Sequence, residues 1–582
     1  GDQSRAKEPE EARGQAMSIH PWVKSYPSHV RWNAPLELSS VQSVLEQAAE
    51  RFGPRPALDF MNKRTTYAEL EALANRAAAG FQKLGVGPGV HVGLFLPNTP
   101  HYVIAFFGVL KAGGVVVNYS PLDALPTLQL KIEDSETDIL VSLDVASLYP
   151  QAEKLLASTR LKTLVIGEFA EMTPAPGPVK AQMTAAGMLA EVKHDERHIA
   201  FRNLIDNDGR YRIHPLGALT DELAVIQYTG GTTGSPKGAM LTHANFTAAC
   251  SLYMEVMTRG EQGLRIGEER VLCILPLFHI YSLTVVMLLG FKLGAELVLH
   301  PRFDPAAAVK DIVEKKITVY MGVPTMHVAL LSVPGLEQMD FSSLRACGSG
   351  GAPLPVAVQE RFESVVGCQL NEGWGMTETA PAGTFNPREG ARRRGSCGLP
   401  YPGTEMKFID VANPEREVKL GERGEICVKG PNVMKGYWKN PEATANSMTA
   451  DGFFRTGDVG IMDPDGFVYI VDRTKDMLLC GGFNVYPRNI EEAIYQHPSV
   501  EEVSVIGIPD DYRGETPKAF VKLKAGAQPL TLEAMKAFLK DRLGKHEMIG
   551  AMEIRDALPK TPVGKISKKD LREYEARAQA EA

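Results

Sequence analysis

The stretch Tyr228-Thr-Gly-Gly-Thr-Thr-Gly-Ser-Pro-Lys-Gly238 overlaps the end of an apolar run, LAVIQYT (223–229), that is typical of a buried strand. Its glycines let backbone N–H groups approach an anion, its hydroxyls donate hydrogen bonds, and Lys237 adds a positive charge. It does not have the form G-x-x-x-x-G-K-[ST], because Pro236 intervenes and no Ser or Thr follows Lys237. The stretch predicts a phosphate cradle after a strand; the alternative is a Gly-rich surface turn.

Downstream of this loop, short β-rich runs alternate with helical segments. Strands are predicted over 271–277, 296–299, 317–321 and 344–347, and helices over 305–316 and 355–366. Residues 41–135 repeat the style, with helices near 41–51 and 67–84 and a strand at 91–96. This alternation predicts an α/β fold with βαβ units and buried parallel sheets.

The pattern changes after about residue 395, and again after Asp472. Turn-rich short strands predict a β-rich part at about 395–472, which closes a large N-terminal domain over 17–472. Beyond it, helix 487–496, strands 500–508 and 518–524, helix 531–542 and strand 551–555 predict a small mobile α+β C-terminal domain, 477–582. The charged connector 473–476 is the expected hinge. Residues 1–16 lack large apolar side chains and are expected to be a disordered extension or a cloning remnant.

Composition excludes several classes of protein. The chain has 582 residues, 44% hydrophobic and 23% charged, which favours a soluble globular protein over a disordered one. With 63 Lys and Arg against 70 Asp and Glu, the net charge of −7 argues against a nucleic-acid binder. Seven cysteines without a C-x-x-C pair predict reduced thiols in the cytoplasm and no zinc or iron–sulfur site. No signal peptide is apparent at the N-terminus.

Residues 271–291 form an uncharged apolar stretch about long enough to cross a bilayer. Pro276, His279 and Tyr281 interrupt it. A buried strand, a turn carrying His279 and a core helix are favoured over membrane insertion, because short apolar runs are more often core.

The 228–238 stretch resembles the signature of the adenylate-forming enzymes, the superfamily of acyl-CoA synthetases, luciferases and peptide-synthetase adenylation domains. Further segments follow in that superfamily's order, and the resemblance covers roughly residues 40–575. They are SGGAPL (349–354), GWGMTE (373–378), GERGE (421–425), RTGD (455–458), DRTKD (472–476), GGFNVYP (481–487) and PKTPVGK (559–565). LPLFHIYSL, VMKGYW (433–438) and GGFNVYP look most like medium- and long-chain fatty acyl-CoA synthetases.

The resemblance implies a two-step reaction that uses ATP, Mg²⁺ and coenzyme A. A carboxylate attacks the α-phosphate of ATP to give acyl-AMP and pyrophosphate, and the thiol of coenzyme A then displaces AMP. Two anions must meet in the first step, and each such repulsion costs about 4 kcal/mol at about 4 Å in an effective dielectric near 20. The site therefore has to supply positive charge and hydrogen-bond donors.

The resemblance also implies site residues. Lys565, Thr377 and Glu378 would be catalytic, with Lys565 bridging carboxylate and α-phosphate and Glu378 ligating Mg²⁺. The β- and γ-phosphates would lie on Thr229, Gly230, Gly231, Thr232, Thr233, Gly234 and Lys237. Adenine and ribose would lie against Gly351, Ala352, Pro353, Trp374, Gly375, Asp458 and Arg473. Taken singly, these residues could equally be turn formers, solvated charges or core aromatics.

Other positions concern the acyl group, coenzyme A and domain rotation. By resemblance, Lys475 is the hinge residue, Gly481 and Gly482 line the pantetheine tunnel, and His279 borders the acyl and pantetheine channels. Gly350 and its small neighbours would leave room for an acyl chain. For Lys475 the alternative is a solvated linker, and for His279 a core histidine.

The chain departs from the pattern of many relatives, which carry Tyr-Lys-x-Pro where His546-Glu-Met-Ile549 stands here, so no coenzyme A contact is assigned to this region. The Arg388–Arg394 loop could meet coenzyme A phosphates or, weakly, a membrane surface, but a solvated loop is favoured.

Three classes of acid substrate are compatible with the sequence: a fatty acid, a dicarboxylate and an aromatic acid. An adenylation enzyme that loads a carrier protein, an inactive binding protein and a luciferase-like oxidative decarboxylase are the alternatives of other classes. The protein is expected to be a monomer or homodimer that binds no nucleic acid.

Overall fold

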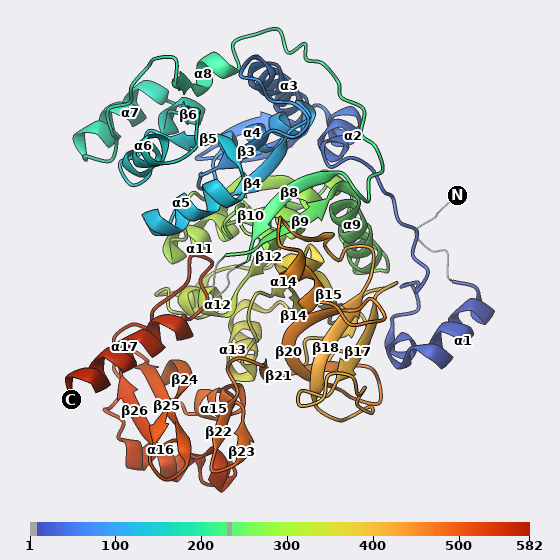
Figure 1. Ribbon diagram of the computed structural model, residues 1–582, viewed down its shortest axis with the longest axis vertical. Helices are drawn as coiled ribbons and strands as arrows, with labels where there is room; N and C mark the ends of the chain where they lie inside the picture. Colours follow the sequence, from blue (N-terminus) through green and yellow to red (C-terminus); the bar gives the residue numbers. More distant parts are fainter. Residues whose placement is uncertain (1–7, 230–235) are drawn as a thin grey trace.

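The computed structural model describes residues 8–229 and 236–582 (Figure 1). Two large sheets lie in the upper part of the molecule, a four-stranded sheet lies beside them, and a separate sheet with its own helices carries the C-terminus. This arrangement confirms the predicted α/β fold with a large N-terminal and a small C-terminal domain.

The eight-stranded sheet carries the 228–238 loop near one edge. Its inner strands are parallel, whereas β9 and β19 close that edge in antiparallel register. Its order is β19 (Gly436–Tyr437), β9 (Gly238–Thr242), β8 (Leu223–Tyr228), β4 (Val115–Asn118), β3 (His91–Leu94), β5 (Thr137–Leu143), β6 (Thr163–Gly167) and β7 (His198–Ala200). The helices in this stretch of chain are α3 (Tyr67–Lys83), α4 (Pro100–Lys111), α5 (Leu125–Asp134), α6 (Tyr149–Ser158), α7 (Pro176–Ala185) and α8 (Phe201–Leu204).

The nine-stranded sheet carries the 349–354 and 373–378 segments. Its order is β16 (Leu399–Pro400), β15 (Ala382–Phe385), β14 (Leu370–Gly375), β13 (Ala346–Ser349), β12 (Val319–Gly322), β10 (Arg270–Cys273), β11 (Glu296–Leu299), β1 (Pro56–Phe60) and β2 (Lys63–Thr66). The helices of this stretch, together with one earlier helix, are α2 (Gln42–Phe52), α9 (His243–Thr258), α10 (Leu289–Lys292), α11 (Pro305–Glu314), α12 (Pro324–Leu331) and α13 (Val356–Val366). Helix α9 contacts β9 of one sheet and β15 of the other, so one apolar core runs through both.

The β-rich part is an antiparallel four-stranded sheet, followed by the small domain. The sheet contains β17 (Glu405–Ile409), β18 (Gly424–Lys429), β20 (Phe454–Met462) and β21 (Val468–Arg473), with α14 (Pro441–Asn446) between β19 and β20. The small domain contains β22 (Leu478–Cys480), β23 (Phe483–Val485), α15 (Pro487–Tyr495), β24 (Val500–Asp510), β25 (Gly514–Leu523), α16 (Leu532–Leu539), β26 (Ala551–Ile554) and α17 (Lys568–Glu581). It has apolar clusters of its own, as an independently packed unit requires.

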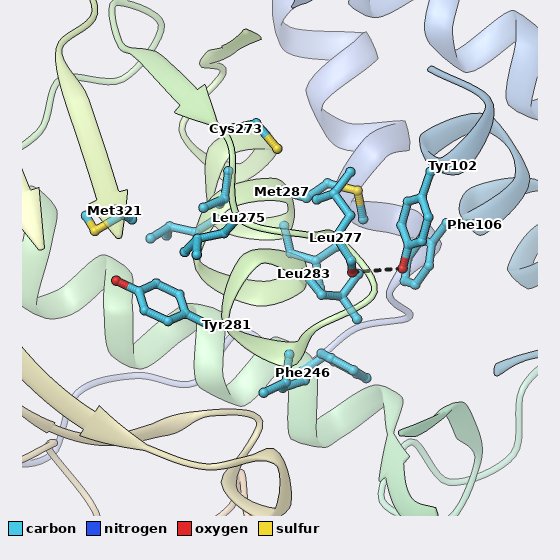
Figure 2. Packing of buried hydrophobic residues seen from close by; sticks show 14 of the residues in the cluster. Tyr102, Phe106, Phe246, Cys273, Leu275, Leu277, Tyr281, Leu283, Met287 and Met321 are labelled. Atoms are coloured by element: carbon cyan, nitrogen blue, oxygen red, sulfur yellow. Dashed lines mark hydrogen bonds between the residues drawn. The ribbon is translucent and has the colours of Figure 1, made fainter. Parts of the chain in front are cut away.

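The apolar stretch 271–291 lies inside the protein. It contains β10, a turn that includes His279, a π-helix over Ser282–Leu288 and α10. Figure 2 shows its side chains packed among those of neighbouring elements, with the Tyr102 hydroxyl 3.0 Å from the Leu277 carbonyl. The favoured interpretation as strand, turn and core helix is confirmed, although the first part of the helix is π rather than α. Among the described residues, no helix is both long enough and apolar enough to cross a bilayer.

The N-terminal segment corrects one expectation. Residues Glu10–Ile19 form α1, Ala16 is buried, and the Glu8 carboxylate accepts hydrogen bonds from the backbone N–H groups of Trp32 and Asn33, both at 3.1 Å. Residues 8–16 therefore belong to the folded chain. The arm continues onto the β-rich part, where the Ser25 hydroxyl donates to the Asp465 carbonyl at 2.6 Å across 440 residues of sequence.

Candidate active site

Lys565 lies at the tip of a tight turn of the small domain. The Thr561 N–H donates to the Lys565 carbonyl at 2.6 Å, and the Gly564 N–H donates to the Thr561 carbonyl at 2.9 Å. Gly564 adopts a φ of +83°, which favours glycine. The turn contacts the large domain, where the Thr325 hydroxyl at the start of α12 donates to the Gly564 carbonyl. Lys565 therefore lies at the junction of the small and large domains.

The surroundings of Lys565 come from several segments that are distant in sequence. A Cβ built on Gly351 would lie 3.7 Å from Lys565 Cε. Burial lowers the pKa of Lys565 to about 8; the charge of Arg473 lowers it further, and the carboxylates of Asp458 and Glu378 oppose this. The structure therefore brings four of the predicted site residues together around this ammonium group.

Asp458 sits beside Trp374 and Arg473. The Trp374 Nε1–H donates to Asp458 Oδ2 at 2.8 Å, and Arg473 Nη1 lies 3.7 Å from Asp458 Oδ1. Asp458 on β20 pairs with Arg473 on β21, so sheet register fixes this neighbourhood. The hydrogen bond to Trp374 was not predicted, because the two residues were assigned to separate parts of a nucleotide.

Glu378 lies in a 3₁₀ turn, Thr377–Thr379, that follows β14. Burial raises the pKa of its carboxyl group, and the Tyr437 hydroxyl donates to its Oε2 at 2.8 Å. The ammonium group of Lys237 lies 5.3 Å from the centre of the Tyr437 ring. Before the turn, a Cβ on Gly375 would lie 1.6 Å from the Pro381 carbonyl oxygen, so only glycine fits there.

The residues present suit a magnesium ion that is shared with a phosphate. The described residues contain no group of three or more His, Cys, Asp or Glu side chains that could hold a metal ion by themselves. Mg²⁺ is commonly held by one or two carboxylates together with substrate phosphates. Glu378, with the Lys237 cation nearby, offers one such carboxylate.

The phosphate-loop residues are described in part. The Thr229 N–H donates to the Lys237 carbonyl at 3.0 Å, which closes the base of the loop at the end of β8. Gly230, Gly231, Thr232, Thr233 and Gly234 lie outside the described residues.

His279 follows a segment that buried amides hold in place. Asn98 accepts from the Leu277 N–H at 2.8 Å, and the Gln227 amide donates to the Phe278 carbonyl at 2.6 Å. Desolvation, with a further contribution from the Lys565 charge, lowers the pKa of His279 to about 3. Its Nδ1 accepts from the Tyr281 N–H at 3.3 Å, so the proton of the neutral ring lies on Nε2.

The glycines expected to leave room for an acyl chain are covered by neighbouring side chains. A Cβ on Gly350 would lie 2.7 Å from the Tyr281 ring, and one on Gly348 would lie 2.5 Å from the Met321 sulfur. Tyr281 and Met321 face the same buried region in Figure 2. Next along the chain, Ala352 is half-buried and Pro353 is exposed. Room beside these glycines requires Tyr281 and Met321 to move.

Gly481 and Gly482 are not brought to Lys565. They form the exposed turn between β22 and β23, with φ of +57° and +83°, and a Cβ on either would meet no atom within 4 Å. Lys475 is exposed and lies near the charges of Arg473 and Asp476, and partial desolvation, followed by the Arg473 charge, lowers its pKa.

The arginine loop is partly solvated: Gly390, Ala391 and Arg394 are exposed, but the arginine side chains also pair with groups of the same chain. Arg392 and Arg394 pair with Glu363 at 2.5 and 2.7 Å, and Arg393 pairs with Asp463 at 2.7 Å. Arg388 donates to the Arg345 carbonyl at 3.0 Å. These side chains bind parts of their own chain because carboxylates and carbonyls distant in sequence face them.

Sequence reasoning missed the polar groups that support the 349–354 segment. His327 Nε2 lies 2.9 Å from the Ser349 hydroxyl, and Glu372 accepts from the Leu354 N–H at 3.1 Å. Burial lowers the pKa of His327 to about 3 and raises that of Glu372 to about 7. The only signal was for His327, a polar residue in the mostly apolar run 324–331. Tyr437 was also missed, although its segment, VMKGYW, contributed to the resemblance.

Comparison with known proteins gives the family. Residues 45–438 match the model of the AMP-binding enzyme family, and residues 489–565 match that of the AMP-binding enzyme C-terminal domain. The chain is 39% identical to the long-chain-fatty-acid–CoA ligase of Bacillus subtilis (strain 168), over 96% of this chain and 99% of that protein. It is 38% identical to the enzyme of the same name from Escherichia coli O6:H1, with the same coverage.

A solved structure supports the same assignment. The anthranilate CoA ligase AuaEII, in complex with anthranoyl-AMP, superposes with a TM-score of 0.83 at 26% identity, covering 94% of this chain and 99% of that one. The predicted family is confirmed: the chain belongs to the AMP-binding enzyme family, as one of its AMP-forming acyl-CoA synthetases.

Proposed function

We propose that this protein activates a medium- or long-chain fatty acid with ATP, first to acyl-AMP and then to acyl-CoA. The observation that carries the proposal is the position of Lys565, a half-buried cation near Asp458, Glu378 and Gly351 at the junction of the two domains. The choice of a fatty acid is supported by the similarity to ligases named for long-chain fatty acids.

In the first half-reaction, a carboxylate oxygen bonds to the α-phosphorus while the bond from that phosphorus to pyrophosphate breaks. Lys565 would lie between the two anions, and Thr377 would donate a hydrogen bond to the α-phosphate. Asp458 would accept from the ribose hydroxyls, beside an adenine that lies against Trp374, Gly375 and the 351–353 segment. Lys237 and the Thr229 loop would bind the β- and γ-phosphates. Magnesium bound at Glu378 would neutralise developing phosphate charge.

In the second half-reaction, the sulfur of coenzyme A bonds to the acyl carbon while the carbon–oxygen bond to AMP breaks. We assign to the small domain a rotation about Lys475 that withdraws Lys565 and presents Gly481 and Gly482. A hinge of this kind absorbs its φ/ψ change in a few residues. His279, neutral and protonated on Nε2, would border the channel as a hydrogen-bond donor.

A second candidate substrate is an aromatic acid. The anthranilate CoA ligase is similar in structure, and the Tyr281 ring beside Gly350 is a flat surface against which an aromatic acid could pack. Both candidate acids would be activated by the same reaction, and they differ only in the shape of the acyl pocket that each requires. The proposed compartment is the cytoplasm, which the seven free thiols support.

The test is pyrophosphate release from ATP and Mg²⁺, with and without coenzyme A, over acids from acetate to palmitate, matched dicarboxylates, benzoate and anthranilate. A maximum at medium or long monocarboxylates that needs coenzyme A for turnover supports the proposal. A maximum at benzoate or anthranilate replaces the fatty acid with an aromatic one. If none of the acids in the panel causes pyrophosphate release, the proposed function is overturned.

A further inference from the structure

The segment 432–438, which we call the strap, leaves the β-rich part of the chain and crosses to the eight-stranded sheet. Its last residues form β19, which pairs with β9 through Gly436 with Met240 and Tyr437 with Ala239. Trp438 N–H also donates to the Gly238 carbonyl at 2.7 Å, directly after Lys237. One end of the strap is therefore fixed to the strand that leaves the phosphate loop.

The other end of the strap binds the turn that carries Glu378. The Met434 N–H donates to the Glu378 carbonyl at 2.8 Å. The Asn432 amide donates to the carbonyls of Thr379 at 2.6 Å and Ala382 at 2.8 Å, on the far side of the same turn. Backbone and side-chain contacts of one short segment thus hold the Glu378 turn at a fixed distance from β9.

Tyr437 is the residue of the strap whose side chain contacts both Glu378 and Lys237. Its hydroxyl donates to Glu378 Oε2 at 2.8 Å, and its ring lies 5.3 Å from the Lys237 ammonium nitrogen. The residue is 6% exposed, and its N–H donates to the Thr444 hydroxyl at 2.9 Å, so its backbone is restrained as well. A carboxylate that accepts one such hydrogen bond keeps its second oxygen directed away from the donor.

We propose that Tyr437 is a positioning residue for the adenylation site: it orients the Glu378 carboxylate toward the metal and holds the Lys237 cation over its ring face. The inference rests on the proposed function and adds to it a residue that itself touches neither ATP nor metal. Neighbouring groups that orient a metal ligand commonly change metal affinity by 10–100-fold when they are removed. A cation over an aromatic face gains about 0.5–2 kcal/mol.

Two substitutions separate these roles. Tyr437→Phe removes the hydroxyl and keeps the ring, so it should weaken Mg²⁺ binding and leave the Lys237 contact unchanged. Tyr437→Leu removes both contacts. The matched control is Tyr67→Phe, which deletes another buried hydroxyl, one that donates to the Ala295 carbonyl.

The experiment measures ATP binding by calorimetry, with EDTA and across a Mg²⁺ titration, beside the adenylation rate. For Tyr437→Phe we expect the half-saturating Mg²⁺ concentration to rise about tenfold or more, with the Kd for ATP in EDTA within about twofold of wild type. Tyr437→Leu should also weaken ATP binding in EDTA. Tyr67→Phe should change neither quantity.

An unchanged Mg²⁺ dependence in Tyr437→Phe overturns the inference. So does an equal weakening of ATP binding with and without metal, because that result describes a general loss of structure. Failure of the proposed function looks different: the wild-type protein itself would then release no pyrophosphate with any acid.

Discussion

Lys565 shows how far a single residue could be understood from sequence. Its role was inferred from the order of motifs, whereas the carboxylates around it belong to segments 100 or more positions away in the chain, whose convergence only the fold supplies. The hydrogen bond between Trp374 and Asp458 was not predictable for the same reason. Residue types were recoverable from sequence, but side-chain partners were not.

The first prediction concerns Lys565→Ala. Removing the ammonium group should nearly abolish pyrophosphate release, because the two anions would then meet without the cation between them. Thioester formation from supplied acyl-AMP should be largely spared. Lys569→Ala, an exposed lysine of the same segment, is the control and should leave both half-reactions unchanged. Equal loss of both half-reactions in Lys565→Ala would contradict the assigned role.

The second prediction is a pH profile. Because burial lowers the pKa of Lys565 to about 8, the free enzyme loses this positive charge as the pH rises through about 8. The kcat/KM for ATP in adenylation should therefore fall above about pH 8, since this parameter reports the free enzyme. Thioester formation from acyl-AMP should not share that decline. The measurement is both half-reactions across about pH 6.5–9.5; a shared decline would assign the titration to another group.

At the scale of elements, periodicity and turn residues placed the strands and helices that were predicted within a few residues of their final bounds. Strand β8 and helices α3 and α13 are examples, because their apolar patterns match their final burial. Several other elements were not predicted, and three of them show why. Helix α17 is mostly polar and looked like a charged tail, α1 lacks large apolar residues over most of its length, and the two-residue β19 exists only through its pairing with β9. Each of these depends on contacts distant in sequence.

The third prediction concerns the packing of β13 against the 271–291 stretch. In Gly350→Ala, the added Cβ would lie 2.7 Å from the Tyr281 ring, so the ring has to shift. Such overpacking costs about 1–3 kcal/mol, and kcat/KM should fall more for palmitate than for short acids. Gly177→Ala on α7, where a Cβ meets nothing within 4 Å, is the control. A uniform loss across chain lengths would show that Tyr281 does not border the acyl site.

For the whole molecule, the division into a large and a small domain followed from the change of pattern after Asp472. Their relative placement could not be predicted, because a few interdomain contacts determine it. One of them joins Glu492 of α15 to the first residue of α13, where the Val356 N–H donates to Glu492 Oε1 at 3.2 Å. A carboxylate at a helix N-terminus is stabilised by about 0.3–1 kcal/mol, and by up to about 2 when partly buried.

The fourth prediction follows from this contact. Glu492→Ala should favour poses in which Lys565 is withdrawn, because one of the contacts that hold the domains in the present arrangement is lost. We expect pyrophosphate release to fall about threefold to tenfold, with thioester formation from acyl-AMP unchanged or faster. Glu533→Ala, on the exposed side of α16, is the control. A parallel decline of both half-reactions would mean that the contact only stabilises the fold.

The N-terminal arm has a consequence for how the chain is made. Ser25 is bound to Asp465, and Trp22 packs on Gly466, so the arm cannot reach its final place until the β-rich part has been synthesised. At about 5–20 residues per second, the 440 intervening residues take about 20–90 s to leave the ribosome. During that time the side chains of Trp22 and Tyr26, both buried in the finished protein, lack their contacts with Gly466 and the Pro400 carbonyl. The growing chain therefore carries this arm unpacked until the segment that it binds has been made, and incomplete chains expose apolar side chains there.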